Sequence, residues 1–416
     1  MNALTDTSRP EWTTSSPAHG VMGIVRLMLT DFRNYDHLNL ELDTRSVVLA
    51  GANGAGKTNV LEALSFLTAG RGLRGAKLAD VGRCSPSEAH ERPWAVSADI
   101  ETPAGSTRLG TGIDAATPDR RSVHIDGKPA KGASALAQHV GAIWLTPAMD
   151  RLFTDTPGER RRFIDRLVTV LDPEHSSRCA AYDQAARRRA RLFRDGVTDN
   201  AWYEALEDTL ARYGIAIAAA RRDTVAQLND VLVATEGPFP AAHLKLTGQV
   251  DDWLEHLAAL DAEDALRNDL VSTRQTWSRT GDAPPPQGPN RSDLMVVMAK
   301  TGRPAADCST GEQKALLVSI VLAHVHLQSE RRGCPPLLLL DEVAAHLDRD
   351  RRRYLFERVT ASGAQAWLTG TDVSVFSDLG DAAQMFSVSD GTVLPVSSAT
   401  VVSHPSSLPS PQSQRA

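Results

Sequence analysis

The chain has 416 residues, which is enough for two or three domains, and 42% of its residues are hydrophobic. That share excludes a wholly disordered chain, because it can form a sizeable buried core. With 45 basic and 51 acidic residues the net charge is -6, which excludes a uniformly basic, histone-like surface but not a local patch that binds nucleic acid.

Residues 1–20 are polar and rich in Ser, Thr and Pro, so we expect a disordered tail without the apolar segment of a secretory signal. Nowhere does the chain approach the ~18 consecutive apolar residues of a membrane span. The cysteines, Cys84, Cys179, Cys308 and Cys334, are far apart and form no CxxC pair. They are typical of reduced thiols in a cytoplasmic protein and indicate no metal site.

Apolar and polar residues then alternate over 24–32 and 38–43, as they do in half-buried strands. A short apolar strand is expected at 46–50, followed by a glycine-rich loop and a helix with apolar spacing over 59–67. Between 93 and 127, glycine-containing turns indicate further strands and hairpins.

From about 150 to 275 the chain shows the i, i+3, i+4 apolar spacing of successive helices, and a Pro/Gly-rich loop is expected at 281–290. We then expect a strand at 291–299, a helix that begins at Ser309 and an apolar strand at 336–342. A helix at 348–359 and a strand at 364–371 follow. Strands on both sides of the helices predict one α/β domain split by a helical lobe. The expected divisions are a tail, the first part of the α/β domain, the lobe, the second part and a Ser/Pro-rich tail, at 1–20, 21–150, 151–290, 291–396 and 397–416.

The loop after the strand at 46–50 fits the phosphate-binding pattern GxxxxGK[ST] at every fixed position. Its residues are Gly51, Ala52, Asn53, Gly54, Ala55, Gly56, Lys57 and Thr58. The glycines let backbone N–H groups face a triphosphate, and the following helix adds its positive N-terminus. Lys57 is expected to reach the β- and γ-phosphates of ATP, and Thr58 to bind Mg²⁺. A chance glycine-rich turn is the alternative, but the position between a strand and a helix favours ATP binding.

An acidic motif ends the apolar strand Leu337–Leu340, where Asp341 and Glu342 follow. Beside a phosphate loop, Asp341 is expected to hold Mg²⁺ through water, and Glu342 to polarise the attacking water as general base. Taken alone, the motif would indicate only a strand that leaves the core.

The run STGEQKALL, which begins at Ser309, has two compatible interpretations. Ser309 and Glu312 fit a capping box, which needs no ligand. The run also fits the signature motif of ABC-type ATPases, in which Ser309, the Gly311 N–H and the helix N-terminus bind the γ-phosphate of ATP held by a second subunit. Residues 343–348 resemble the D-loop of these ATPases, whereas Thr371 stands where their transporters usually carry a histidine.

Arginines are grouped at Arg160–Arg162, at Arg187–Arg189 with Arg191 and Arg194, and at Arg351–Arg353. Such runs are usually solvated helix faces. Because aromatic residues make up only 5% of the chain, any nucleic-acid binding is expected to use phosphate contacts to a duplex rather than base stacking.

Five segments carry a resemblance to a known family: DFRNY, GANGAGKTNVLEALSFLTAGRGLRG, TPAMDRLFTDTPGERRRFIDR, STGEQKALL and LLLLDEVAAHLD, at 31–35, 51–75, 146–166, 309–317 and 337–348. In this order and spacing, the chain resembles the RecF family of bacterial recombination mediators over about residues 21–396. The resemblance implies an ABC-type ATPase head with a mixed or parallel β core, flanking helices, an antiparallel β subdomain and an inserted α-helical lobe.

The same resemblance implies that the protein binds ATP and Mg²⁺, dimerises head to head around two nucleotides, and binds duplex DNA beside single-strand gaps. It implies a weak, DNA-stimulated ATPase that acts with RecO and RecR in loading RecA. Gly51–Thr58 would bind the nucleotide, and Arg33 would contact nucleotide or DNA. Many relatives carry Asp-Asp where this chain has Asp341-Glu342, which brings the chain closer to the general ABC pattern.

Other classes of ATPase are the alternatives. A structural-maintenance (SMC) protein needs long coiled-coil arms, but only about 250 residues separate Lys57 from Ser309, and the heptad runs are short. A transport ATPase would lack the helical insertion, and an overcoming-lysogenization-type nuclease needs an acidic metal domain after the head. A short SMC-like chromosome protein, or such a nuclease without its nuclease domain, stays open, whereas Lys57, Asp341 and Glu342 argue against a scaffold without hydrolysis.

Overall fold

A computed structural model describes residues 21–83, 92–235, 237–281, 286–344 and 347–396. The two expected tails, 1–20 and 397–416, lie outside these residues, as does Cys84. The other three cysteines are free thiols, as expected. None of the helices in the described ranges combines the length and apolarity that crossing a membrane requires.

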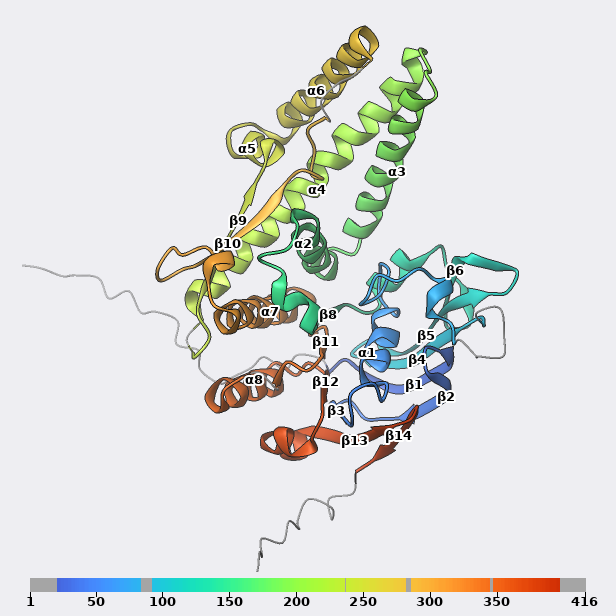
Figure 1. The fold of residues 1–416 in the computed structure, drawn as a ribbon, viewed down its shortest axis with the longest axis vertical. Helices are drawn as coiled ribbons and strands as arrows, with labels where there is room; N and C mark the ends of the chain where they lie inside the picture. The colour runs from blue at the N-terminus through green and yellow to red at the C-terminus, as the bar shows by residue number, and fades with distance from the viewer. Residues whose placement is uncertain (1–20, 84–91, 236, 282–285, 345–346, 397–416) are drawn as a thin grey trace, which may run out of the picture.

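A six-stranded, mostly parallel sheet forms the centre of the head, in the order β14-β13-β3-β12-β11-β8 (Figure 1). Its strands are β3 (Ser46–Ala50), β8 (Ala142–Leu145), β11 (Leu337–Leu340), β12 (Ala366–Gly370), β13 (Ala383–Ser389) and β14 (Thr392–Pro395). Three of them, β3, β11 and β12, are the strands expected at 46–50, 336–342 and 364–371. The sequence predicted no strand at β8, which lies beside β11, and none at β13 and β14.

The central strands are buried on both faces, which explains their unbroken apolar sequence. Leu338 and Leu340 of β11 face one hydrophobic core, and Leu337 and Leu339 face a second. The head helices are α1 (Lys57–Ser65), α7 (Thr310–Arg332) and α8 (Arg349–Ala361). Figure 1 shows α7 and α8 on one side of the sheet, and α1 on the other, next to an antiparallel sheet.

The antiparallel sheet has the order β2-β1-β4-β5-β6-β7. Its strands are β1 (Gly23–Phe32), β2 (Tyr35–Glu41), β4 (Ala95–Thr102), β5 (Gly105–Asp114), β6 (Thr117–Ile125) and β7 (Lys128–Pro129). The predicted alternation at 24–32 and 38–43 is thus confirmed as a hairpin, and the region 93–127 as strands joined by tight turns.

The helical lobe projects away from the head (Figure 1). It contains α2 (Pro157–Leu171), α3 (His175–Arg194), α4 (Asn200–Ala234), β9 (Ala242–Thr247), α5 (Gln249–His256) and α6 (Ala259–Thr280), and β10 (Asp293–Met298) follows it in the chain. Its outer part has a hydrophobic core of its own, formed by α3, α4, α5 and α6. The expected strand at 291–299 is β10, which pairs with β9, a strand that the sequence did not predict. The divisions at 150/151 and 290/291 stay predictions.

Short 3-10 helices complete the described part of the chain. They are η1 (Ala79–Val81), η2 (Ala133–Gln138), η3 (Pro147–Arg151), η4 (Ala305–Asp307) and η6 (Val373–Ala382). Among them, η3 follows β8 directly and therefore lies at the carboxyl edge of the parallel sheet, where β3 and β11 also end.

Candidate active site

The glycine-rich loop connects β3 to α1, as the pattern predicted. Gly54 and Gly56 have φ values of 82° and 115°, which side chains disfavour. A Cβ at Gly56 would lie 2.5 Å from the Asn34 amide nitrogen and 2.7 Å from the Tyr35 hydroxyl. Tyr35 is buried and donates to the Gly56 carbonyl at 3.1 Å. The DFRNY segment therefore supports the loop from behind, a role that the motif alone did not reveal.

Lys57 points back into the loop. Its ammonium donates to the carbonyls of Gly51 at 2.6 Å and Ala52 at 2.9 Å, and the residue is 4% exposed. Burial lowers the pKa of Lys57, and the charges of Glu342 and Asp341 oppose that shift. The cation is thus held beside the loop and the two carboxylates, where it can meet a bound phosphate.

Asp341 and Thr58 are 283 positions apart in the chain and adjacent in the structure. The Thr58 hydroxyl lies 2.9 and 3.0 Å from the two carboxylate oxygens of Asp341. A third residue, Thr369 at the end of β12, donates to Asp341 at 2.7 Å and accepts from the Glu342 N–H at 2.9 Å. Thr369 is buried, and the sequence does not single it out, since the position that matches the transporters' histidine is Thr371, which is exposed.

Glu342 has an unusual backbone. Its φ is 53°, in the left-handed region that costs a residue with a side chain of order 1–3 kcal/mol. The hydrogen bond from its N–H to Thr369 stabilises this conformation. Strain of this kind is concentrated at functional sites, which supports a catalytic role for Glu342.

The oxygens of Thr58 and Asp341 fit a magnesium site. Mg²⁺ is a hard cation that takes oxygen ligands and is usually bound through one or two protein groups and substrate phosphates. The hydroxyl and carboxylate converge within 3.0 Å, beside the phosphate loop. These two residues are the ones that would hold the ion.

The predicted capping box at the start of α7 is present. The Glu312 carboxylate accepts from the Ser309 N–H and from the Ser309 hydroxyl, both at 2.8 Å, and Ser309 caps the helix. Ser309 and Gly311 are exposed, and a Cβ at Gly311 would meet no atom within 4 Å. The helix N-terminus is therefore open to a ligand, and the signature role stays a prediction.

Arg33 is engaged by the protein itself. Its guanidinium binds both carboxylate oxygens of Glu62, at 2.9 and 2.6 Å, and donates to the Asp80 carbonyl at 2.5 Å. Glu62 is completely buried on α1 and also pairs with Arg74. In this arrangement Arg33 fixes DFRNY to α1, and a contact with nucleotide or DNA stays a prediction.

The D-loop-like segment is only partly described, because residues 345–346 lie outside the described ranges. Val343 and Ala344 are buried in the core next to α7. Asp348 caps α8 by accepting from the Arg351 N–H at 2.9 Å. Its expected contact with a second subunit stays a prediction.

Several of the grouped arginines are structural. Arg160 forms a bidentate ion pair with Asp293. Arg161 donates to the carbonyl of Ser292, the residue before β10. Arg189 is 4% exposed and binds Glu207 at 3.0 Å. Within these groups, an arginine is available for DNA only where it forms no ion pair or hydrogen bond inside the protein.

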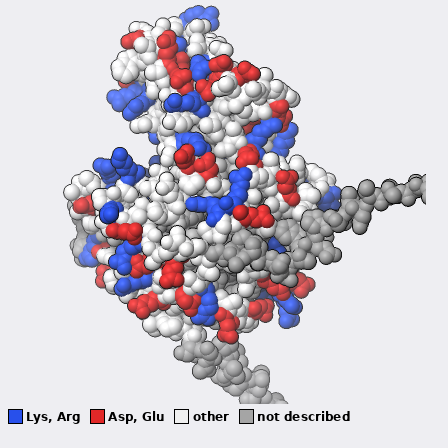
Figure 2. Space-filling view, turned by 180° about the vertical axis from the view of Figure 1, so that it is seen from behind, with Lys and Arg blue, Asp and Glu red and all other residues white. Residues whose placement is uncertain are grey.

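The exposed arginines of α3 are different. Arg187, Arg188 and Arg194 are exposed, and no ion pair is found for them within the described residues. Arg191 is 75% exposed and makes a solvent-accessible pair with Asp195. Arg187, Arg191 and Arg194 recur at i, i+4 and i+7, so they share one helix face. Figure 2 shows, on the back of the molecule, acidic and basic side chains interspersed over lobe and head.

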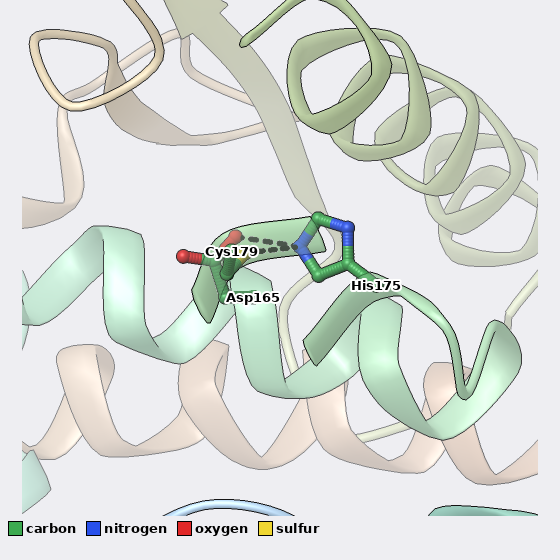
Figure 3. A group of neighbouring side chains, drawn as sticks. All are labelled: Asp165, His175 and Cys179. Atoms are coloured by element: carbon green, nitrogen blue, oxygen red, sulfur yellow. Dashed lines mark hydrogen bonds and ion pairs between the residues drawn. The ribbon is translucent and has the colours of Figure 1, made fainter. Parts of the chain in front are cut away.

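Asp165, His175 and Cys179 form a compact cluster at the junction of α2 and α3 (Figure 3). The His175 Nε2 atom lies 2.8 Å from Asp165 and 3.4 Å from the Cys179 sulfur. Both Asp165 oxygens also accept from Arg221 at 2.8 Å. Arg221 already supplies the positive charge that a metal would bring, so the cluster joins helices and does not favour a cation.

The model of the RecF/RecN/SMC N-terminal domain family matches residues 23–393. A DNA replication and repair protein RecF of Allorhizobium ampelinum is 44% identical over 373 residues, which cover 88% of this chain and 97% of the relative. The RecF of Mesorhizobium japonicum is 45% identical over 379 residues, which cover 90% and 98%.

A solved structure of the recombination mediator protein RecF with ATPrS, in the RecFOR pathway, has a similar fold. Its TM-score is 0.75 at 20% identity, and the match covers 91% of this chain and 99% of that one. The matches confirm the expected ABC-like ATPase head with mixed α/β sheets and a helical region.

Proposed function

The chain belongs to the RecF family, and from that premise we propose that it is an ATP-dependent DNA-binding protein of recombinational repair and replication. The observation that carries the proposal is the convergence of Lys57, Thr58, Asp341 and Glu342 at one edge of the parallel sheet. A related RecF has been solved with ATP, which supports ATP as the ligand of this site.

Backbone N–H groups of the loop Gly51–Thr58 and the N-terminus of α1 bind the phosphates, and Lys57 neutralises their charge. When bound at Thr58 and Asp341, Mg²⁺ supplies charge stabilisation of the phosphate oxygens. Glu342 accepts the proton of the attacking water, and Thr369 holds its backbone in place. The outcome is slow, DNA-stimulated hydrolysis of ATP to ADP and phosphate.

The second half of the nucleotide site comes from a second copy of the chain. Ser309 and Gly311 are exposed at the start of α7 and present a hydroxyl, a backbone N–H and a helix N-terminus. These groups suit the γ-phosphate of ATP bound to another subunit. The protein is therefore an ATP-dependent homodimer, in which the nucleotides lie at the interface.

DNA binding is assigned to the exposed face of α3. Arg187, Arg188 and Arg194 are available for phosphate contacts, which position a duplex without reading its sequence. The preferred substrate is duplex DNA beside a single-strand gap. There the protein acts in the cytoplasm with RecO and RecR, and promotes RecA loading indirectly, in keeping with the pathway named for the related structure.

Light scattering with ATP on two variants tests the shared-nucleotide mechanism. Glu342→Gln keeps the nucleotide contacts and removes the general base, so hydrolysis should slow by about 10²–10⁴-fold and the dimer should persist. Ser309→Arg should bind ATP and stay monomeric, because the bulky cation blocks the second subunit. A monomeric Glu342→Gln protein, or a normal dimer of Ser309→Arg, would contradict the mechanism.

The DNA surface is tested by salt titration. Replacing Arg187 and Arg188 with Ala should weaken duplex binding and reduce the slope of log K against log salt by about 2. Arg353→Ala, which removes an exposed arginine of α8, is the matched control and should leave the slope unchanged. Arg189 is left intact, because its loss would destabilise the lobe. Equal slopes in the double variant and the wild type would show that these arginines do not contact DNA and only form a solvated helix face.

A further inference from the structure

Lys314 is a buried cation on α7 that the proposed mechanism does not use. It lies five residues after Ser309, and its side chain is 7% exposed. Its ammonium lies 3.7 Å from the Asp150 carboxylate, whose side chain is 24% exposed. An ion pair with this burial is weak evidence for stability, since the loss of hydration offsets most of the attraction. The pair therefore calls for another explanation.

Asp150 belongs to η3, at the edge of the sheet where the catalytic carboxylates lie. The segment follows β8, the parallel neighbour of β11. The Asp341 N–H donates to the Leu145 carbonyl at 2.9 Å, so the two chain segments are still paired where each strand ends. Asp150 comes five residues after Leu145, so the Lys314–Asp150 pair belongs to the carboxyl edge of the sheet at which the Asp341-Glu342 turn also lies.

The charges around Lys314 agree with this placement. Burial lowers the pKa of Lys314, whereas Asp150 and, more weakly, Glu342 raise it. These directions agree with a Lys314 ammonium that is paired with Asp150 at the carboxyl edge of the sheet, where Glu342 also lies.

We propose that Lys314 is a positioning residue for hydrolysis in its own subunit, and that it links the two ATP sites of the dimer. This inference rests on the proposed ATP-dependent dimer. The ammonium, fixed by Asp150, sets the position of the Glu342 carboxylate in cis. Ser309 and Gly311, at the start of the same helix, serve the nucleotide of the other subunit.

Ser309 and Lys314, to which we assign the two functions, lie close together along α7. Five residues of α-helix span about 7.5 Å, at 1.5 Å per residue. The helix is packed in the core over most of its length, and His324 further along is fixed to the Leu167 carbonyl at 2.7 Å. A displacement of the N-terminus by the partner's nucleotide therefore reaches Lys314 and changes its contact with Asp150.

Mixed dimers distinguish this role from support of the signature motif. Two differently tagged subunits are combined, dimers are isolated through both tags, and single-turnover hydrolysis of ATP is measured. In the first dimer, one subunit carries Lys314→Met and the other carries Glu342→Gln. In the second, one subunit carries both changes and the other is wild type.

If Lys314 acts in cis, the first dimer has no intact site, and hydrolysis falls about ten- to hundred-fold below that of the wild-type/Glu342→Gln dimer. The second dimer retains one intact site and matches that reference. If Lys314 only supports Ser309 and Gly311 for the other subunit, the two results are exchanged, and the proposal is overturned. Equal rates in both dimers would also overturn it.

Three controls complete the experiment. Lys314→Arg should recover most of the rate without changing KM, since it keeps the charge. Asp150→Asn tests the same link and should give the cis pattern even where Lys314→Met folds poorly. Lys300→Met, which removes an exposed lysine, should have no effect. A wild-type chain that forms no dimer with ATP would refute the proposed function itself, a result distinct from the exchanged pattern.

Discussion

The two halves of the proposed nucleotide site differ in how completely the single chain satisfies them. At the sheet edge, Lys57, Asp341 and Thr369 have hydrogen-bond partners within the chain and are buried. At the start of α7, Ser309 and Gly311 are exposed, and only the capping box occupies them.

In the proposed dimer, folding builds the first half and assembly completes the second. The buried half has its donors and acceptors placed by the fold, so we expect ATP to replace internal contacts such as that between Lys57 and the loop carbonyls. The exposed half has a helix N-terminus that is capped by Ser309 and Glu312 but is otherwise open to solvent. Changes in the first half should therefore alter ATP binding by the monomer, whereas changes in the second should leave that binding intact and alter dimerisation.

The largest effect is expected for Lys57→Ala. It removes the one charged donor of the loop, and two charge-assisted hydrogen bonds to phosphate are worth about 3 kcal/mol together, or roughly a hundred-fold in ATP affinity. Fluorescent ATP analogues measure the loss in the monomer, and circular dichroism should show an intact fold. Wild-type affinity in Lys57→Ala would refute the assignment of the phosphate loop, and the buried residues could no longer be treated as one half of a nucleotide site.

A smaller effect is expected for Thr369→Val, which keeps the shape of the side chain and removes its hydroxyl. Asp341 loses a donor and the Glu342 N–H loses an acceptor, and each loss costs about 1–3 kcal/mol where the group stays buried and unpaired. Hydrolysis should fall about ten- to hundred-fold. ATP affinity without Mg²⁺ should change little, because Thr369 does not contact the loop residues that bind phosphate.

The control for this variant is Thr371→Val, two residues along, where the hydroxyl is exposed. It should hydrolyse ATP at the wild-type rate. If Thr371→Val were the slower of the two, the position usually occupied by a histidine in ABC transporters would be the functional one, and Thr369 would be structural only.

The sequence predicted the parts of the site that a local motif specifies. The phosphate loop, the Asp341-Glu342 strand end and the capping box each lie within a few consecutive residues. Thr369 and Asp150 could not be found in this way, because they act only after β12 and β8 take their places beside β11. β9 has a different cause: its six alternating residues, between α4 and the eight-residue α5, are a weak local signal.

Burial also separates residues that the sequence treats alike. Arg187, Arg188 and Arg189 are consecutive and chemically identical, but only Arg189 faces Glu207 in the lobe core. Helical periodicity predicts that one of three neighbours points inward, and it does not say that this neighbour finds a buried carboxylate. A charged run must therefore be divided by structure before it is assigned to DNA.

The smallest effect is expected for Ser309→Ala, and its comparison with Ser309→Asp separates the cap from the ligand role. Asp is as good a helix cap as Ser, whereas Ala costs about 1 kcal/mol of stability. Ser309→Ala should therefore unfold at lower urea concentration and dimerise with ATP a few-fold more weakly, since one hydrogen bond to phosphate is worth roughly 1 kcal/mol. Ser309→Asp keeps a capping oxygen but loses the hydroxyl that donates to Glu312, so it should also be less stable to urea than the wild type. It should fail to dimerise altogether, because its carboxylate repels the γ-phosphate. Both variants should bind ATP normally as monomers, since the buried half of the site is untouched. If Ser309→Asp dimerised as well as the wild type, the start of α7 would be only a capped helix, and the exposed half of the site would have to be sought elsewhere.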